Sequence, residues 1–150
     1  METMNEVLDF AIKREIEAAA FYARLAELVD SPPMKRSLLQ FSGEEEGHRV
    51  KLEAVKAGKL ALNMRVKVPS LGIADAVEAR EVTDPAAMTY QDVLILAMER
   101  EKAAYRLYTE LAELVDDEAV RMVFGALAQE EARHKLRFEI EYDEVVLKEN

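Results

Sequence analysis

Two pentapeptides, Glu44-Glu45-Glu46-Gly47-His48 and Glu130-Glu131-Ala132-Arg133-His134, stand 86 positions apart in the chain. At the same spacing, residues 13–53 superpose on residues 99–139 without a gap. Self-similarity over a stretch of this length indicates that one structural unit occurs twice. We therefore expect two similar halves related by an approximate two-fold axis.

Both halves show the apolar spacing of helices. Hydrophobic side chains recur at intervals of three and four residues, as they do on the buried face of an amphipathic helix. Helices are expected over about residues 4–30, 33–57, 89–115 and 117–146. Because the connection inside each half is short, each half is predicted to be an antiparallel helical hairpin.

Local signals predict where these helices begin and end. Pro32-Pro33 ends the first helix and starts the second, because proline fits the first turn of a helix and not its interior. Gly58 suits the position that follows the second helix. Thr89 suits the N-cap of the third helix, and Asp116 and Asp117 suit that of the fourth.

The two hairpins are joined by about thirty residues, 58–88, in which only a short helical piece near residues 73–79 is expected. A helix of about 25 residues is roughly 37 Å long at 1.5 Å per residue, and the joining segment can run that distance back along the bundle. We predict an all-α, antiparallel four-helix bundle of two hairpins joined by a long crossover. The whole chain, residues 1–150, is expected to form one domain.

The composition supports the same class and excludes several functions. Half of the residues are hydrophobic and a third are charged, with five Gly and four Pro, which favours helices over a turn-rich sheet. The net charge of −10 argues against nucleic acid or an anionic membrane as a partner. Without a secretory signal or a long apolar run, the expected location is cytoplasmic.

Acidic side chains occupy seam positions where apolar residues are expected. Residues seven apart return to nearly the same helix face, and two such stripes are Leu8, Glu15, Tyr22, Val29 and Leu94, Glu101, Tyr108, Val115. The seams of the second and fourth helices contain Glu45 with His48 and Glu131 with His134. Six polar side chains are therefore predicted to enter one core.

Buried carboxylates at one level need positive charge nearby, because an isolated one would cost several kcal/mol or take up a proton. Two divalent metal ions meet this need when the glutamates are deprotonated and the histidines neutral. One Glu on each of two helices, with a Glu-x-x-His pair on each of the other two, is a dimetal pattern. The predicted metal ligands are Glu15, Glu45, His48, Glu101, Glu131 and His134.

Glu44 and Glu130 are alternative ligands, since each stands four residues before a histidine. Their helical stripes include Lys51 and Arg137, however, which do not belong in a core. Glu45 and Glu131 are therefore preferred as ligands.

At these residues the chain resembles the ferritin-like superfamily and, within it, the rubrerythrin group, over nearly all of its length. The resemblance implies a ferritin-like bundle with two iron ions, for which manganese or zinc are the alternatives. It implies that Glu15 and Glu101 are single-helix ligands, that Glu45 and Glu131 bridge or chelate, and that His48 and His134 are terminal nitrogen ligands. It also places Tyr22 and Tyr108 beside the site as candidate catalytic residues, although both are equally explained as large core residues whose hydroxyls need a partner.

Two features depart from that group. Rubrerythrins carry an additional rubredoxin-like domain whose iron is held by four cysteines, and this chain has no cysteine. They also carry an extra Glu one turn beyond the ligand of the third helix, where this chain has Ala104. An external electron-donor protein is therefore expected.

The expected function is that of a di-iron carboxylate oxidoreductase that reacts with peroxide or O2. One alternative is a ferroxidase that serves iron handling, and another is a catalase-like dimanganese site. A third, from a different class, is a non-catalytic helical module that is stabilised by metal and binds another protein. Because bundles of this kind commonly form homo-oligomers, a homodimer is expected.

Overall fold

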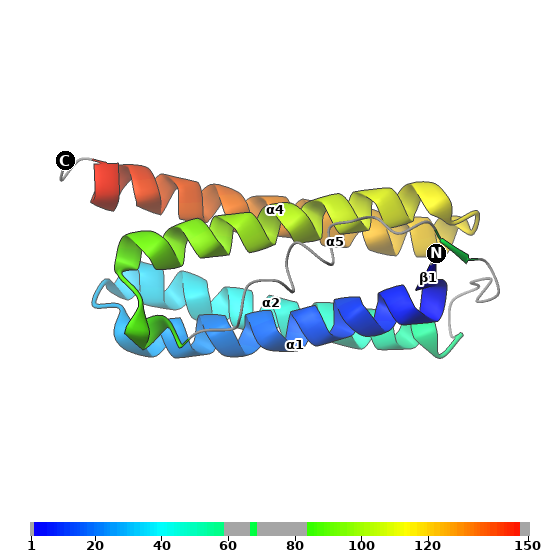
Figure 1. Ribbon diagram of the computed structural model, residues 1–150, viewed down its shortest axis with the longest axis horizontal. Helices are drawn as coiled ribbons and strands as arrows, with labels where there is room; N and C mark the ends of the chain where they lie inside the picture. The colour runs from blue at the N-terminus through cyan, green and yellow to red at the C-terminus, as the bar shows by residue number, and fades with distance from the viewer. Residues whose placement is uncertain (1, 59–66, 69–83, 148–150) are drawn as a thin grey trace.

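The structure, a computed structural model, describes residues 2–58, 67–68 and 84–147. Four long helices make up most of it: α1 (Met4–Leu28), α2 (Pro32–Lys56), α4 (Tyr90–Leu114) and α5 (Glu118–Glu141). All four lie along the long axis of the molecule (Figure 1). The prediction of an all-α, four-helix bundle is confirmed.

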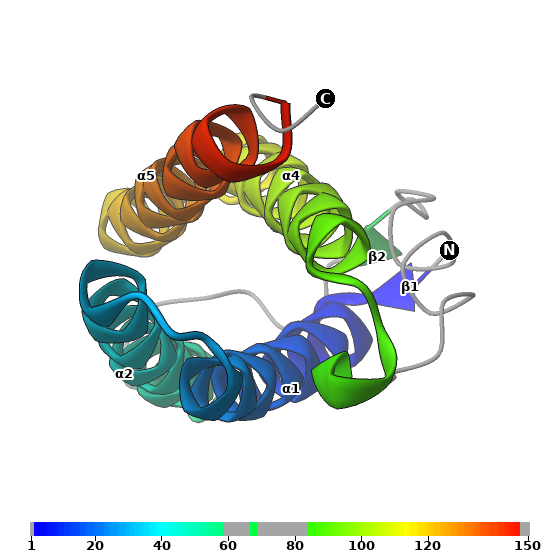
Figure 2. The same ribbon diagram turned by 90° about the vertical axis from the view of Figure 1, so that its left-hand side faces the viewer.

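The helices surround a common axis in the order α1, α2, α5, α4, and neighbours run in opposite directions (Figure 2). The α1 helix packs mainly on α2, and α4 packs mainly on α5, so the two predicted hairpins are present. The α2 helix ends and α4 begins at opposite ends of the bundle, as the predicted crossover requires (Figure 1). Most of the crossover, with the helical piece expected near residues 73–79, lies outside the described residues.

Each helix begins at a side chain that accepts a hydrogen bond from the first turn. Ser31, Thr89 and Asp117 accept from backbone N–H groups at 3.3, 3.1 and 3.0 Å, and Thr3 forms a reciprocal capping box with Glu6. Such caps satisfy donors that the helix itself leaves unpaired. Gly58 follows α2 with a φ of 77°, a left-handed conformation that glycine adopts without strain.

Some short elements were not predicted from the sequence. The two-residue strands β1 (Glu2–Thr3) and β2 (Lys67–Val68) pair antiparallel, and a 3-10 turn, η1 (Pro85–Ala87), precedes α4. The fourth helix was expected to continue to residue 146, but a π-helical turn, η2 (Tyr142–Val146), follows Glu141. The first helix ends at Leu28 rather than near residue 30, because Val29 is already extended.

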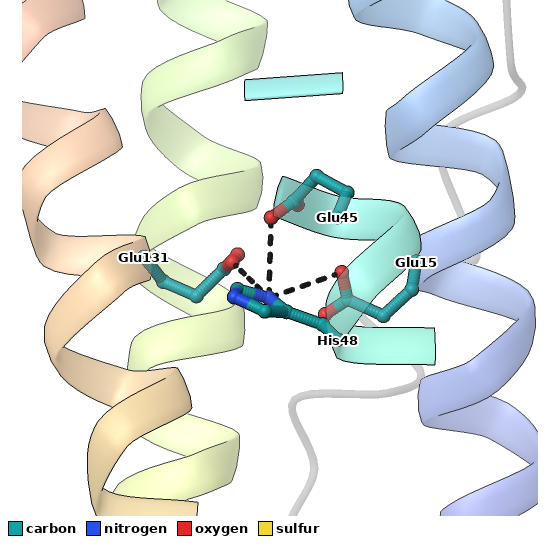
Figure 3. Close-up of side chains that lie close together, drawn as sticks. All are labelled: Glu15, Glu45, His48 and Glu131. Atoms are coloured by element: carbon teal, nitrogen blue, oxygen red, sulfur yellow. Dashed lines mark ion pairs between the residues drawn. The ribbon is translucent and has the colours of Figure 1, made fainter. Parts of the chain in front are cut away.

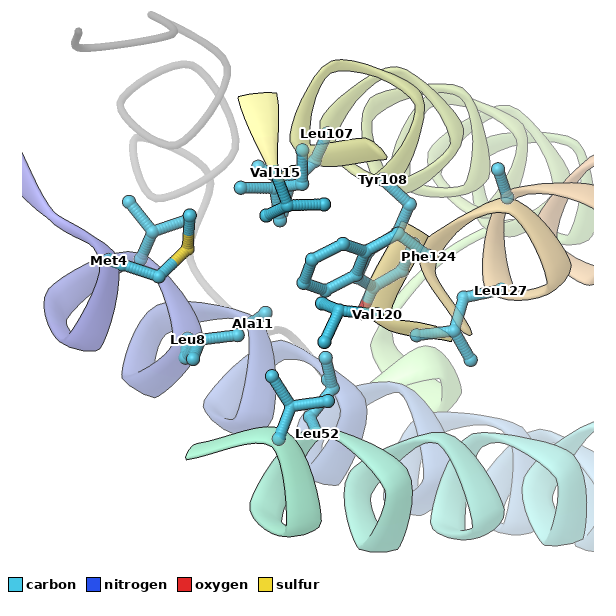
Figure 4. Packing of buried hydrophobic residues seen from close by; sticks show 14 residues of the cluster. Met4, Leu8, Ala11, Leu52, Leu107, Tyr108, Val115, Val120, Phe124 and Leu127 are labelled. Atoms are coloured by element: carbon cyan, nitrogen blue, oxygen red, sulfur yellow. The ribbon is translucent and has the colours of Figure 1, made fainter. Parts of the chain in front are cut away.

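Among the described residues, the apolar core is divided into two clusters. The first, shown in Figure 4, lies towards the start of α1 and the end of α2 and contains Met4, Leu8, Leu52, Leu111, Phe124 and Leu127. The second lies towards the end of α1 and contains Leu25, Met34, Leu38, Phe41, Leu94 and Phe138. Between them remains one layer of the bundle, which holds polar side chains. Within the described part of the chain, no helix is both long and apolar enough to cross a membrane.

Candidate metal centre

Six polar side chains meet in the layer between the two apolar clusters, and they are the six predicted ligands. They come from all four helices: Glu15 from α1, Glu45 and His48 from α2, Glu101 from α4, and Glu131 and His134 from α5. None of the six is more than 2% exposed to solvent. Their positions follow from helix geometry, because residues three, four and seven apart share a face.

The six side chains form two overlapping groups. In the first, Glu15, Glu45, His48 and Glu131 each offer one ligand atom, and all four atoms lie within 4.8 Å of one another. In the second, the same holds for Glu45, Glu101, Glu131 and His134. Glu45 and Glu131 belong to both groups, so their carboxylates lie between the two histidines.

The distances around His48 show how closely the first group converges (Figure 3). Its Nδ1 atom lies 3.0 Å from Glu131 Oε1, 3.3 Å from Glu45 Oε1 and 3.4 Å from Glu15 Oε2. Around His134, Nδ1 lies 3.5 Å from Glu45 Oε1 and 3.6 Å from Glu101 Oε2. The two imidazole rings are nearly parallel, at an interplanar angle of 9°, with centroids 6.4 Å apart.

One buried atom of each of these six side chains lacks a hydrogen-bond partner. In the described part of the chain these atoms are the Nδ1 atoms of both histidines and one carboxylate oxygen each of Glu15, Glu45, Glu101 and Glu131. A buried polar atom without a partner is costly, and native structures contain few of them. Four oxygens and two nitrogens that face one small volume are a set of donors for metal ions. Four carboxylate charges would also balance two divalent cations.

The electrostatics of the cluster fit this interpretation. The pKa of Glu45 is raised well above its usual range, first by burial and then by the charges of Glu131, Glu101 and Glu15. For Glu131, burial and the charges of Glu101 and Glu15 have the same effect on the pKa. Burial lowers the pKa of His48, but the adjacent carboxylates, Glu15 first, outweigh this effect and raise it to about 9. Without bound cations, these groups would hold protons instead.

Tyr22 and Tyr108 each reach across to the opposite hairpin. The Tyr108 hydroxyl donates to Glu15 Oε1 at 2.5 Å, and the Tyr22 hydroxyl donates to Glu101 Oε1. Both tyrosines are 1% exposed. Burial, and then the charge of the carboxylate that each contacts, raises both pKa values well above 10, so both hydroxyls keep their protons. The structure thus places the two candidate catalytic residues in contact with the cluster.

Glu44 and Glu130 take a place that was not predicted from the sequence. Rather than facing the cluster, they contact the outer nitrogens of the histidines: Glu44 Oε2 lies 2.8 Å from His134 Nε2, and Glu130 Oε2 contacts His48 Nε2. A carboxylate on the outer nitrogen fixes the tautomer and the ring orientation of a metal-binding histidine. Their recurrence at the same offset from both histidines was the sequence signal for this role.

The donor set also limits the metal. Carboxylate and imidazole donors suit iron or manganese, are too hard for copper(I), and outnumber the ligands that structural zinc normally uses. The chain has no cysteine that could add a thiolate. The residues present therefore fit a pair of hard or intermediate divalent ions.

The chain is similar to known proteins in sequence and in fold. A family model described as Rubrerythrin matches residues 6–142. Among curated proteins, no sequence matches the chain.

Two solved structures share the fold. One, described as a ferritin-like diiron-carboxylate protein from Thermotoga maritima, is 19% identical with a TM-score of 0.78, covering 97% of this chain and 98% of that one. The other, a hypothetical protein from Pyrococcus furiosus, is 24% identical with a TM-score of 0.69, covering 93% of this chain and 87% of that one. At these identities the structural likeness shows the ferritin-like fold alone.

Proposed function

Because the chain belongs to the rubrerythrin family, we propose that it is a di-iron carboxylate oxidoreductase that reduces peroxide or O2 with electrons from a separate donor. The observation that supports this proposal most is that six buried atoms able to bind metal converge from all four helices. None of these six atoms has a hydrogen-bond partner among the described residues. A helical module that bound another protein without any metal would have no reason to bury four carboxylates at one level.

The two overlapping groups suggest how the ligands would divide. Glu15 and His48 would hold one ion, and Glu101 and His134 would hold the other. Glu45 and Glu131, which belong to both groups, would be shared between the ions. The four carboxylates would then balance the charge of two ferrous ions.

When bound, two ferrous ions supply two electrons, and a peroxide that accepts two electrons and two protons yields two water molecules. The protein would supply orientation, proton donors and a dry environment. Tyr22 and Tyr108 hold protons on hydroxyls that contact Glu101 and Glu15, so they are the nearest phenolic proton donors in the described part of the chain. The apolar clusters on either side of the polar layer restrict the entry of water.

The electron donor would be separate from these residues. A thiolate-bound iron centre needs cysteines, and the chain has none. A donor of that kind would therefore have to approach the bundle from outside these 150 residues.

The experiment starts from protein purified without added metal, with metal analysis and a visible spectrum. We expect about two iron ions per chain and a diferric absorption band that a reductant bleaches. In the absence of oxygen, one equivalent of peroxide per reduced pair should restore the band. The matched control is Glu53→Gln, a substitution at an exposed ion pair with Arg49, which should behave like the unmodified protein. The Glu101→Gln variant should lose the reaction.

Other outcomes would assign the chain to a different class. Continued oxidation of many ferrous ions per chain would identify a ferroxidase. A colourless, zinc-filled protein without redox activity would identify a metal-stabilised module, and the proposal would be abandoned.

A further inference from the structure

The two halves of the metal centre are not equivalent, although the repeat makes their ligands equivalent. Each histidine receives its outer carboxylate from the opposite hairpin: Glu44 of α2 reaches His134 of α5, and Glu130 of α5 reaches His48 of α2. The difference between the halves lies in what holds these two carboxylates and rings. Any consequence of this difference for metal binding rests on the proposed di-iron function.

Around His134, the outer carboxylate is held from several sides. Arg133 Nη2 donates to Glu44 Oε2 at 2.6 Å, and Gln40 Nε2 donates to Glu44 Oε1 at 3.2 Å. The guanidinium carbon of Arg133 also lies 5.8 Å from the centroid of the Phe41 ring. Arg133 thus links the carboxylate to the aromatic ring beside it.

The ring of His134 is itself packed between aromatic side chains. Phe41 stacks on it with centroids 4.0 Å apart, and Tyr22 meets it edge-on at 6.4 Å. Both His134 and its outer carboxylate are therefore restricted before any metal binds.

Around His48, the corresponding supports are missing in the described part of the chain. The repeat places Gly47 where the other half has Arg133, Ala126 where it has Gln40, and Leu127 where it has Phe41. Among the described residues, no aromatic ring apart from that of His134 is in ring contact with His48. The side chain of Glu130 is 36% exposed, against 22% for Glu44, so fewer protein atoms surround Glu130.

We infer that Glu44, held by Arg133, pre-orients His134, and that the metal position beside His134 binds its ion more tightly than the position beside His48. A ligand whose orientation is fixed beforehand loses less freedom on binding, and outer carboxylates of this kind change metal affinity about 10- to 100-fold. The ion beside His48 is then the last to load and the first to exchange.

The test is a titration of the metal-free protein with Co(II) against a competing chelator, which yields two stepwise dissociation constants, one tighter and one looser. Two unequal constants alone do not decide the question, because the first ion repels the second even in a symmetric site. The comparison of Glu44→Gln with Glu130→Gln decides it. Glu44→Gln should weaken the tighter constant about 10- to 100-fold, whereas Glu130→Gln should weaken only the looser one. Arg133→Ala should shift the tighter constant in the direction of Glu44→Gln, by a smaller factor.

A gain-of-function variant keeps the test informative if a loss-of-function variant folds poorly. Gly47 has no atom within 4 Å of the place where a Cβ would stand, so Gly47→Arg has room on the surface. It should supply the missing guanidinium to Glu130 and tighten the looser constant several-fold. Gly47→Ala is the matched control for the change in helix propensity, and it should leave both constants unchanged.

We therefore expect different Co(II) titration curves for Glu44→Gln and Glu130→Gln. In crystals of the unmodified protein that contain substoichiometric Mn(II), the ion should occupy the position beside His134. Identical curves for Glu44→Gln and Glu130→Gln, or equal occupancy of the two positions, would overturn the inference and leave the di-iron function intact. Failure of the unmodified protein to bind any ion would overturn the proposed function itself.

Discussion

The hydroxyl of Tyr108 on α4 donates a hydrogen bond to Oε1 of Glu15 on α1, 2.5 Å away, and so joins the two hairpins inside the polar layer. Its repeat counterpart, Tyr22, makes the same bond in the opposite direction, to Glu101. These two bonds and the two between outer carboxylates and histidines all cross from one hairpin to the other.

Removal of the Tyr108 hydroxyl should therefore destabilise the bundle. In Tyr108→Phe, Oε1 of Glu15 loses its donor while remaining buried, so the free energy of unfolding should fall by about 1–3 kcal/mol. Urea unfolding of the metal-free protein measures this change. Tyr105→Phe, on the exposed face of the same helix, is the control and should change stability by less than about 0.5 kcal/mol. Equal stability of the two variants would mean that the bond contributes nothing.

The shared position of Glu131 predicts an unequal effect of ligand removal. Because Glu131 belongs to both groups, Glu131→Ala should weaken the binding of both ions, whereas Glu15→Ala should leave the second group of four complete. Metal analysis after dialysis should then find less than one ion per chain for Glu131→Ala and about one for Glu15→Ala. The same stoichiometry in both variants would argue against a shared carboxylate.

The raised pKa values of the cluster predict how the stability of the metal-free protein depends on pH. Because the pKa of His48 is raised from 6.5 to about 9, its bound proton stabilises the metal-free fold below pH 6.5. That stabilisation is lost as the pH rises to about 9. The raised pKa values of Glu45 and Glu131 act in the same direction, since the folded state again holds more protons than the unfolded state. The free energy of unfolding should fall by about 1–3 kcal/mol over this interval.

Urea titrations of the metal-free protein at several pH values would measure this fall. The zinc-loaded protein is the control, because metal binding replaces the protons and becomes stronger as the ligands deprotonate. A metal-free protein whose stability rose from pH 6.5 to about 9 would contradict the assigned protonation.

The apolar cluster beside the polar layer predicts a large effect of cavity formation. Phe124 is fully buried and stacks on Tyr108 with ring centroids 6.4 Å apart. Phe124→Ala should cost about 3–5 kcal/mol of unfolding free energy, measured on the zinc-loaded protein. Met122→Ala, two residues away and 69% exposed, should stay within about 0.5 kcal/mol of the unmodified protein. A small loss for Phe124→Ala would indicate that the neighbouring helices collapse into the space.

Much of the fold could be predicted from the sequence because its periodicity is long and repeated. Helices of 24 or 25 residues give many apolar positions, and Ser31, Thr89 and Asp117 mark three of their starts. The strands β1 and β2 are only two residues long, too short for any alternation of side chains to be recognised. The π-helical turn after Glu141 has no comparable signal in the sequence.

The candidate site was predicted as a set of six residues because Glu-x-x-His occurs twice and Glu15 and Glu101 interrupt apolar stripes. The structure brings these six side chains together, and their role as ligands stays a prediction. Helical phase excluded Glu44 and Glu130 from the seam, but it says nothing about which residue of another helix lies opposite. Their contacts with His134 and His48 depend on the approach of α2 to α5, which only the assembled bundle defines.

Reciprocal contacts between two similar halves are what an isologous pair of identical subunits displays. Two copies of a single hairpin, paired in this way, would supply every ligand of this centre. Because their sequences would be identical, both metal positions would have the same surroundings. When the two hairpins belong to one chain, their sequences can differ. Here one half carries Arg133 where the other carries Gly47, so a substitution can change the surroundings of one metal position without changing those of the other.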